Sequence, residues 1–202
     1  MTTLPRERER VVREGWTPAA AGEPELPASR AVLVTAQAGE LITRGAVAGL
    51  TAGTGFLLGN MGFATTQGKP AEAPLMDIST VFHGTSKPAA MTPTPDMVAT
   101  GLVTHLGLSI LFGISFALLV AAFARMLRNP LVLALAGVLY GLALYVVNFQ
   151  IFGNTLFPWF TNPAGPNQGF EVGIHAAFGL MLAPFFLGMA WQFARRRDRQ
   201  TV

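Results

Sequence analysis

Four long apolar stretches decide what this chain can fold into. They lie at residues 41–63, 98–124, 130–152 and 170–193. Each is long enough to cross about 30 Å of hydrocarbon, which takes roughly 20 residues at the helical rise of about 1.5 Å per residue. We therefore predict an all-α fold, a polytopic membrane protein with four transmembrane helices.

The composition agrees with this prediction. Of the 202 residues, 51% are hydrophobic and only 12% are charged, against about 25% charged in an ordinary soluble domain. The absence of cysteine excludes a disulfide framework, thiolate metal sites and cysteine nucleophiles. The net charge of +3 comes from short basic blocks beside apolar runs, so the partner that the sequence predicts is the lipid bilayer and not nucleic acid.

The positions of Lys and Arg predict the orientation. Twelve of the fourteen flank one side of the spans, and only Lys69 and Lys87 fall on the other. Because basic residues favour the cytoplasmic side, both termini are expected in the cytoplasm, and the 64–97 and 153–169 loops are expected outside. The short "RNP" turn ends at Pro130, which suits the first turn of a helix, so the second and third spans are antiparallel.

The two ends of the chain are predicted to be cytoplasmic tails. Residues 1–40 mix charges, proline and alanine without the apolar segment of a signal peptide, so we expect a largely disordered tail with a short helix near residues 6–15. A docking segment is the alternative interpretation. Residues 194–202 form a basic tail.

An internal repeat predicts how the four spans are related. With a shift of 88 residues, "AGLTAGTGFLLGN" at 48–60 falls on "AGVLYGLALYVVN" at 136–148, and with a shift of 70 residues His105 falls on His175. Two spans return the chain to its starting side. The spans are therefore expected to form two tandem helical hairpins, a parallel pseudo-repeat about an axis along the membrane normal.

Small residues four apart predict the packing faces. Such rows let helices approach closely where lipid gives no hydrophobic drive for pairing, and we expect them to bring the first and third spans together. His105 and His175 lie on similar small-residue faces, so they should point inward. The row residues are Gly45, Gly49, Gly53, Gly137 and Gly141.

Polar residues inside the spans form the best candidate site. Counting from the helix ends places them all in the outer half of the membrane, so we expect one constellation. One interpretation is interhelical hydrogen bonding, worth roughly 0.6 kcal/mol per contact, in which imidazoles and amides satisfy one another. The other is a functional site, because ionisable residues inside a membrane usually serve a function. The members are Asn60, His105, Asn148, His175 and Glu171.

Two functional alternatives use these histidines. In a small transporter or channel, His105 and His175 would titrate beside Glu171. In a haem or copper protein the same two histidines would be the metal ligands. The absence of cysteine and of a close His-x3-His pair disfavours that second alternative, so we predict no cofactor.

The two outer loops carry further signals. "LMDISTVFHG" at 75–84 is too apolar for simple disorder and predicts a short helix or strap on the membrane surface. Phe157, Trp159 and Phe160 have the composition of an aromatic belt and are predicted to anchor the chain at the interface. A rim that faces a partner is the alternative.

No catalytic motif is present. The glycines of "GTGFLLGNMG" belong to an apolar stretch without the Lys-Ser/Thr of a phosphate-binding loop, and there is no nucleophile elbow and no His-Glu-x-x-His. We therefore predict that the protein is not an enzyme.

Together, "AG-x3-G" in the odd spans and "HLGLSILFG" and "HAAFG" in the even ones resemble small uncharacterised four-helix proteins of the bacterial inner membrane, of the YagU-like kind. The resemblance covers about residues 41–193. It implies a fold and a location in the bacterial inner (cytoplasmic) membrane, without an activity.

The function predicted from these observations is structural. Little mass lies outside the spans, and the glycine-rich faces and tails suit docking. These features predict an accessory subunit of a larger membrane complex, such as an energy-converting, electron-transfer one. Other membrane subunits are thus expected partners. The transporter or channel and the haem or copper protein stay open as alternatives.

Overall fold

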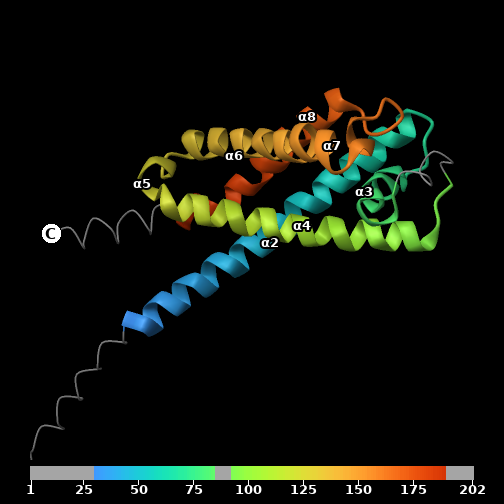
Figure 1. The fold of residues 1–202 in the computed structure, drawn as a ribbon. Coiled ribbons are helices and arrows are strands. Elements are labelled where there is room, and N and C mark those ends of the chain that lie inside the picture. Colours follow the sequence, from blue (N-terminus) through green and yellow to red (C-terminus); the bar gives the residue numbers. More distant parts are fainter. Residues whose placement is uncertain (1–29, 85–91, 190–202) are drawn as a thin grey trace, which may run out of the picture. The chain divides into compact units, whose positions relative to one another are not determined.

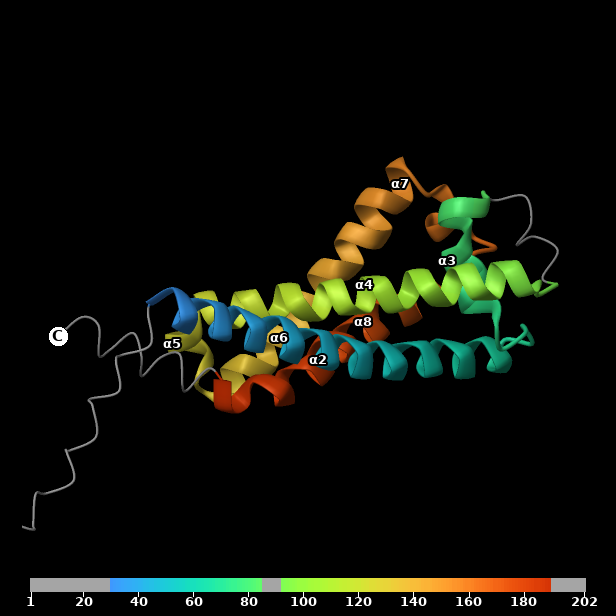
Figure 2. The ribbon, with the colours of Figure 1, turned by 90° about the horizontal axis from the view of Figure 1, so that it is seen from below.

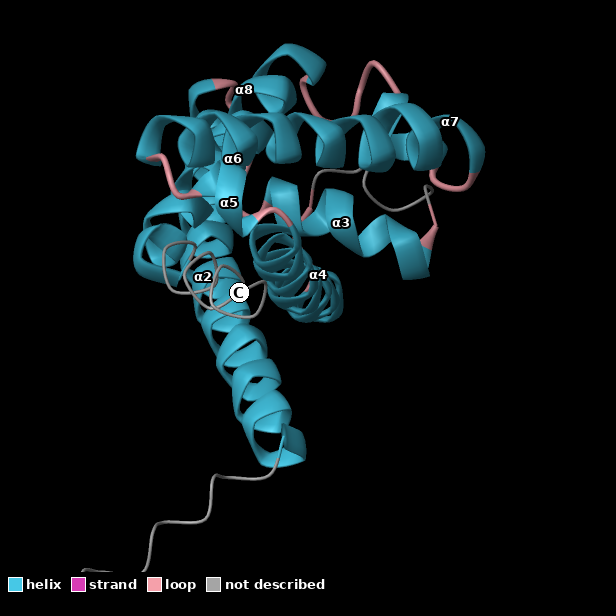
Figure 3. Ribbon diagram, turned by 90° about the vertical axis from the view of Figure 1, so that its left-hand side faces the viewer, coloured by secondary structure: helices cyan, strands magenta, loops and turns pink. Residues whose placement is uncertain are grey.

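A computed structural model describes residues 30–84 and 92–189, and it is helical through most of these ranges (Figures 1 and 3). No strand occurs in them, so the predicted all-α fold is confirmed. Residues 1–37 and 38–202 are two separate units, and the packing described below is that of the second. The elements are α2 (Arg30–Thr66), α3 (Ala73–His83), α4 (Pro95–Ala122), α5 (Ala124–Leu127), α6 (Pro130–Tyr145), the π-helix η2 (Val146–Phe152), α7 (Gly153–Thr155), the 3-10 helix η3 (Pro158–Thr161), α8 (Gln168–Leu182) and the 3-10 helix η4 (Ala183–Phe186).

Within the described ranges, four helices are long and apolar enough to cross a membrane, as the sequence predicted. Helix α2 begins at Arg30, so residues 30–40 are helical and do not belong to a disordered tail. The rest of the predicted N-terminal tail, residues 190–193 of the fourth span and the basic tail lie outside the described residues. The candidate spans run over Gln37–Thr66, Pro95–Ala122, Pro130–Thr155 and Gln168–Met189.

Asparagine caps start the third and fourth spans. The Asn129 side chain accepts hydrogen bonds from the backbone of Leu131 at 2.9 Å and Val132 at 3.4 Å, and Pro130 is the first residue of α6, as predicted. The Asn167 side chain accepts from Phe170 at 3.0 Å at the start of α8. These bonds satisfy N–H groups that the first helical turn leaves without a partner.

The glycine rows pack each odd span against an even one. A Cβ atom placed on Gly45 would lie 2.6 Å from the Ile114 Cα atom, and one placed on Gly141 would lie 2.8 Å from the His175 carbonyl carbon. Helix α2 therefore meets α4 (Figure 2) and α6 meets α8 at backbone contact. The expectation that the rows would join the first and third spans is wrong, because each row faces the small residues of its even neighbour.

The two ends of the bundle differ in how they are filled. Near α5, the core is closed by side chains without solvent exposure, such as Phe116, Leu133 and Phe186. The Phe116 ring contacts Tyr140 at a centroid distance of 5.1 Å and Phe186 at 5.4 Å. The opposite end, where α3 lies (Figure 1), is roofed by α3 and by residues 157–167; we call it the α3 end.

Helix α3 is the short helix predicted in the first outer loop, and it packs into the protein. A Cβ atom on Gly101 of α4 would lie 2.7 Å from the Leu75 carbonyl carbon. Met76 and Ser79 of α3 are buried, so one face of the helix covers α4. Gly84 ends α3 with a φ of +71°, a left-handed conformation that glycine adopts without strain.

Candidate functional site

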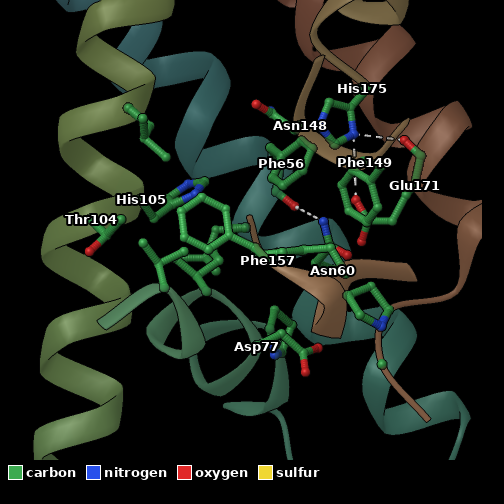
Figure 4. Close-up of a pocket in the computed structure, with 18 of the residues that line it drawn as sticks. Phe56, Asn60, Asp77, Thr104, His105, Asn148, Phe149, Phe157, Glu171 and His175 are labelled. Carbon is green, nitrogen blue, oxygen red and sulfur yellow. Dashed lines mark hydrogen bonds and ion pairs between the residues drawn. The ribbon is translucent and has the colours of Figure 1, made fainter. Parts of the chain in front are cut away.

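A cavity of about 700 Å³ lies at the α3 end of the bundle. Its walls come from α2, α3, α4, η2, α8 and the segment that precedes α8, and most of its surface is apolar. All five members of the predicted constellation line this one cavity (Figure 4). The structure therefore brings together residues that lie more than a hundred positions apart in the sequence. The five are Asn60, His105, Asn148, His175 and Glu171.

His105 is held against the neighbouring helix. Its Nε2 donates to the carbonyl of Gly53 at 2.9 Å, and since a carbonyl can only accept, the proton sits on Nε2. The close packing of Gly53 on Ser109 makes this contact possible. The other ring nitrogen, Nδ1, is left as an acceptor.

His175 is held by its own helix. Its Nδ1 donates to the Glu171 carbonyl at 2.8 Å and lies 3.4 Å from the Glu171 carboxylate, one turn earlier in α8 (Figure 4). Glu171 is only 6% exposed, and this long contact is the one its carboxylate makes with the described residues. The site therefore holds a buried carboxylate that is poorly paired, which is costly in an apolar surrounding.

Phe56 separates the two histidines. Its ring stacks on His105 at a centroid distance of 5.7 Å and meets the edge of His175 at 4.9 Å (Figure 4). The two imidazoles cannot share an ion while this ring stands between them, so the geometry does not fit a metal centre built on both. No group of three or more His, Asp or Glu side chains gathers in metal-binding positions within the ranges described.

The predicted hydrogen bonds among these side chains are replaced by bonds to the backbone. Asn60 donates to the Phe56 carbonyl at 3.3 Å, as His105 and His175 do to other carbonyls. The Asn148 side chain makes no hydrogen bond with a described residue, and Asn148 is half-buried at the cavity wall. The polar groups therefore line an open space instead of filling it.

A π-helical segment places Asn148. Over Val146–Phe152 the helix widens to the π form, which often marks a functional site. In this segment Val147, Asn148 and Phe149 all line the cavity. Gln150 instead points away; it donates to the Tyr145 hydroxyl at 2.9 Å, and Tyr145 donates to Gln168 at 3.0 Å. The two amides of "VVNFQIF" thus have different roles, one in the cavity wall and one in a tether to α8.

The aromatic residues predicted as interface anchors form the roof of the cavity. Phe157 and Phe160 line it, and Trp159 is 4% exposed. The Trp159 indole donates to the Asp77 carboxylate at 2.6 Å, which joins η3 to α3. A side chain this buried cannot lie among lipid headgroups, so the anchor prediction is wrong for Trp159.

Sequence reasoning missed three residues of the site: Phe56, Lys69 and Asp77. Asp77 had a signal, because it is the one acid within the apolar run "LMDISTVF". Lys69 lines the cavity, and its ammonium group donates to the carbonyls of Ala164 at 3.5 Å and Gly165 at 3.3 Å. Phe56 had no signal, since a phenylalanine in an apolar span is unremarkable.

Burial raises the pKa of the Asp77 carboxyl from 3.8 to about 6. The hydrogen bond from Trp159 and the charge of Lys69 lower this pKa, but less than burial raises it, and the nearby Glu171 adds to the increase. The folded state thus binds a proton more readily than the unfolded chain. The stabilisation that protonated Asp77 brings is complete below about pH 3.8 and is lost as the pH rises through about 6.

A fluorescence titration tests this pH dependence. In a Trp16→Phe, Trp191→Phe background, Trp159 is the only remaining tryptophan, and we expect its emission to change with a midpoint near pH 6 because its indole donates to Asp77. Asp77→Asn should abolish the transition. A transition that persists in the Asp77→Asn variant would show that another group titrates.

In comparisons with known proteins, no family model, no curated protein and no solved structure matched this chain. The resemblance to YagU-like proteins stays a prediction, and the function has to be argued from the site.

Proposed function

We propose that this chain is a multi-pass membrane protein that binds a small, mostly apolar molecule in the cavity at its α3 end. The observation that carries the proposal is the cavity itself. Its volume of about 700 Å³ lies within the range of about 300–1,000 Å³ that is usual for small-molecule sites, which are likewise apolar with a few convergent polar groups.

Interhelical bonding alone accounts less well for the site. Residues that serve only to join helices would close the space between them, as the core near α5 does. Instead, five polar side chains from α2, α4, η2 and α8 border one space that is walled by phenylalanine rings. The π-helical segment at this place supports a site of function. Such a molecule could be carried across the membrane or sensed there, and the transporter alternative belongs to this proposal.

Photolabelling with a neutral aromatic diazirine, 3-trifluoromethyl-3-phenyldiazirine, tests the proposal in reconstituted vesicles. We expect labelling near Phe149 and Phe157 to saturate with probe concentration, because a cavity has a limited capacity. Labelling of lipid-facing residues should rise linearly. Mass spectrometry of the labelled peptides separates the two.

A pair of neighbouring variants supplies the control. Thr104→Phe fills the cavity from α4, since Thr104 lines it, and should reduce the saturable labelling at least fivefold. Val103→Phe adds a similar bulk at a position that is 72% exposed and should leave it unchanged. Linear labelling throughout, or equal losses in both variants, would contradict a binding cavity.

The two halves of the chain support a pseudo-repeat of tandem hairpins. Gly49 packs on Ser109 in the first half, and Gly137 packs on Gly179 in the second. These pairs are equivalent under the shifts of 88 and 70 residues found in the sequence. We propose that the halves arose by duplication, each as one odd and one even span.

The proposed orientation places the α3 end outside, with both termini in the cytoplasm of a bacterial cell. The distribution of Lys and Arg supports it. The chain has no cysteine, so single-cysteine variants report on each side. A maleimide that cannot cross membranes should label Thr66→Cys, and not Arg128→Cys, in intact cells; the reverse pattern would invert the topology.

The prediction of an accessory subunit remains a second proposal, with a non-catalytic role. It is favoured by the small extent of the described chain outside the spans, which is mainly α3 and residues 156–167. Native mass spectrometry of the protein extracted from its own membranes in mild detergent should then show larger subunits in fixed stoichiometry. Recovery of the protein alone, or only with copies of itself, would contradict this role.

A further inference from the structure

Most hydrogen-bond donors around the cavity are already used within the protein. His105, His175 and Asn60 each donate to a backbone carbonyl. Thr104 and Ser109, which also line the cavity, donate their hydroxyl protons to the carbonyls one turn earlier in α4. Among the side chains described at the cavity wall, Asn148 and the exposed Asn167 have side-chain N–H groups that donate to no described residue.

The acceptors, in contrast, remain available. The second nitrogen of each histidine and the side-chain oxygen of Asn60 have no donor among the described residues. The Glu171 carboxylate has one contact, at 3.4 Å. A site in which most donors are already used and several acceptors are free favours a ligand that donates hydrogen bonds or carries positive charge over an anion.

The charged side chains that line the cavity also favour a cation. Its lining includes two carboxylates, Asp77 and Glu171, and one ammonium group, that of Lys69. The lining thus has one more carboxylate than ammonium groups. Lys69 is turned to the carbonyls of Ala164 and Gly165, and Asp77 already accepts a hydrogen bond from Trp159. Glu171 is therefore the carboxylate that most lacks a partner.

Aromatic rings contact the histidine that lies beside the carboxylate of Glu171. Phe56 and Phe149 meet the edge of the His175 ring at centroid distances of 4.9 Å and 5.5 Å, and that ring touches Glu171. Figure 4 shows Phe149 beside Glu171 and Phe56 facing the same space. The faces of aromatic rings attract cations, most strongly where water is excluded.

We propose that the ligand of this cavity is a lipophilic organic cation, bound by the phenylalanine rings and by the carboxylate of Glu171. The inference rests on the proposed function above and names the class of its ligand. Apolar groups of the cation would fill the ring-lined space, and its charge would balance the buried carboxylate. A cation of this kind reaches the site without losing as much hydration as a metal ion would.

Two probes of nearly equal size and opposite charge test the proposal. Tetraphenylphosphonium and tetraphenylborate are added as competitors of the saturable diazirine labelling. Because the interfacial dipole potential makes the two ions partition differently into a membrane, they are compared at equal concentrations within the bilayer. We expect tetraphenylphosphonium to compete at a concentration at least tenfold lower than tetraphenylborate. Equal competition, or a preference for the anion, would overturn the proposal.

Variants that remove the charge of one carboxylate test whether Glu171 gives the cavity its preference for a cation. Glu171→Gln should weaken competition by tetraphenylphosphonium at least tenfold while labelling by the neutral probe persists, which shows that the cavity is intact. Glu40→Gln makes the same change outside the cavity and should have no effect. Should Glu171→Gln fail to fold, the wild-type comparison of the two ions still decides.

Failure of this inference differs from failure of the proposed function. If the neutral probe labels the cavity saturably but the cation has no advantage, the cavity binds another class of molecule. If no saturable labelling occurs in the wild-type protein, the cavity is not a binding site and both proposals are wrong.

Discussion

Replacing Gly49 with alanine is expected to lower the free energy of unfolding by about 3 kcal/mol, at the upper end of the cost of overpacking. The added Cβ atom would overlap the Ser109 carbonyl of α4 and lie 3.1 Å from the Gly113 Cα atom. Backbone atoms cannot rotate away as a side chain can. The helices must separate, which loses van der Waals contact along the whole α2–α4 seam.

Gly62→Ala, in the same helix, is the matched control. Nothing lies within 4 Å of a Cβ atom at Gly62, so the change should be neutral or should stabilise by up to about 1 kcal/mol, the usual helix preference of alanine over glycine. The measurement is reversible unfolding in mixed detergent micelles. Equal effects at both positions would contradict backbone contact between α2 and α4.

A second large effect is expected in the core near α5. Phe116→Ala should lower the free energy of unfolding by about 2–4 kcal/mol. The cost in water-soluble cores is about 3–5 kcal/mol, and it is reduced here because lipid also solvates the phenylalanine of an unfolded chain. What is lost is the contact of this unexposed ring with Tyr140 and Phe186.

Phe123→Ala is the control for that change. Phe123 follows the last residue of α4 and is 56% exposed, so its loss should cost less than about 1 kcal/mol, as expected of a surface position. The same unfolding assay compares the two variants. Similar losses would show that the core near α5 is not closed as the structure places it.

The candidate site was predictable in part. Helix length, depth and the repeat were enough to assign Asn60, His105, Asn148, His175 and Glu171 to one place, because a membrane span fixes how far along its axis each residue lies. The sequence could not reveal whether these side chains would bond to one another or border a space. That depends on Phe56, whose ring lies between the histidines, and a ring's rotamer is set by its neighbours in three dimensions.

The roof of the cavity shows the same limit. Trp159 is amphipathic, and amphipathic residues after a span usually meet the membrane interface. Here the Trp159 indole donates to the carboxylate of Asp77 at 2.6 Å, and Asp77 belongs to α3, 82 residues earlier in the chain. A contact at that separation leaves no local pattern in the sequence. Composition alone therefore favoured the membrane interface for Trp159 over a buried position.

The sequence by itself determined the four apolar helices, the start of the third at Pro130 and the closeness of the polar residues in depth, because length, apolarity and caps act locally along the chain. Only the tertiary structure decided that each glycine row meets an even span, and that α3 and Trp159 roof a cavity. A row of small residues indicates that another helix can pack closely against it. Which helix does so depends on how all the helices fit together.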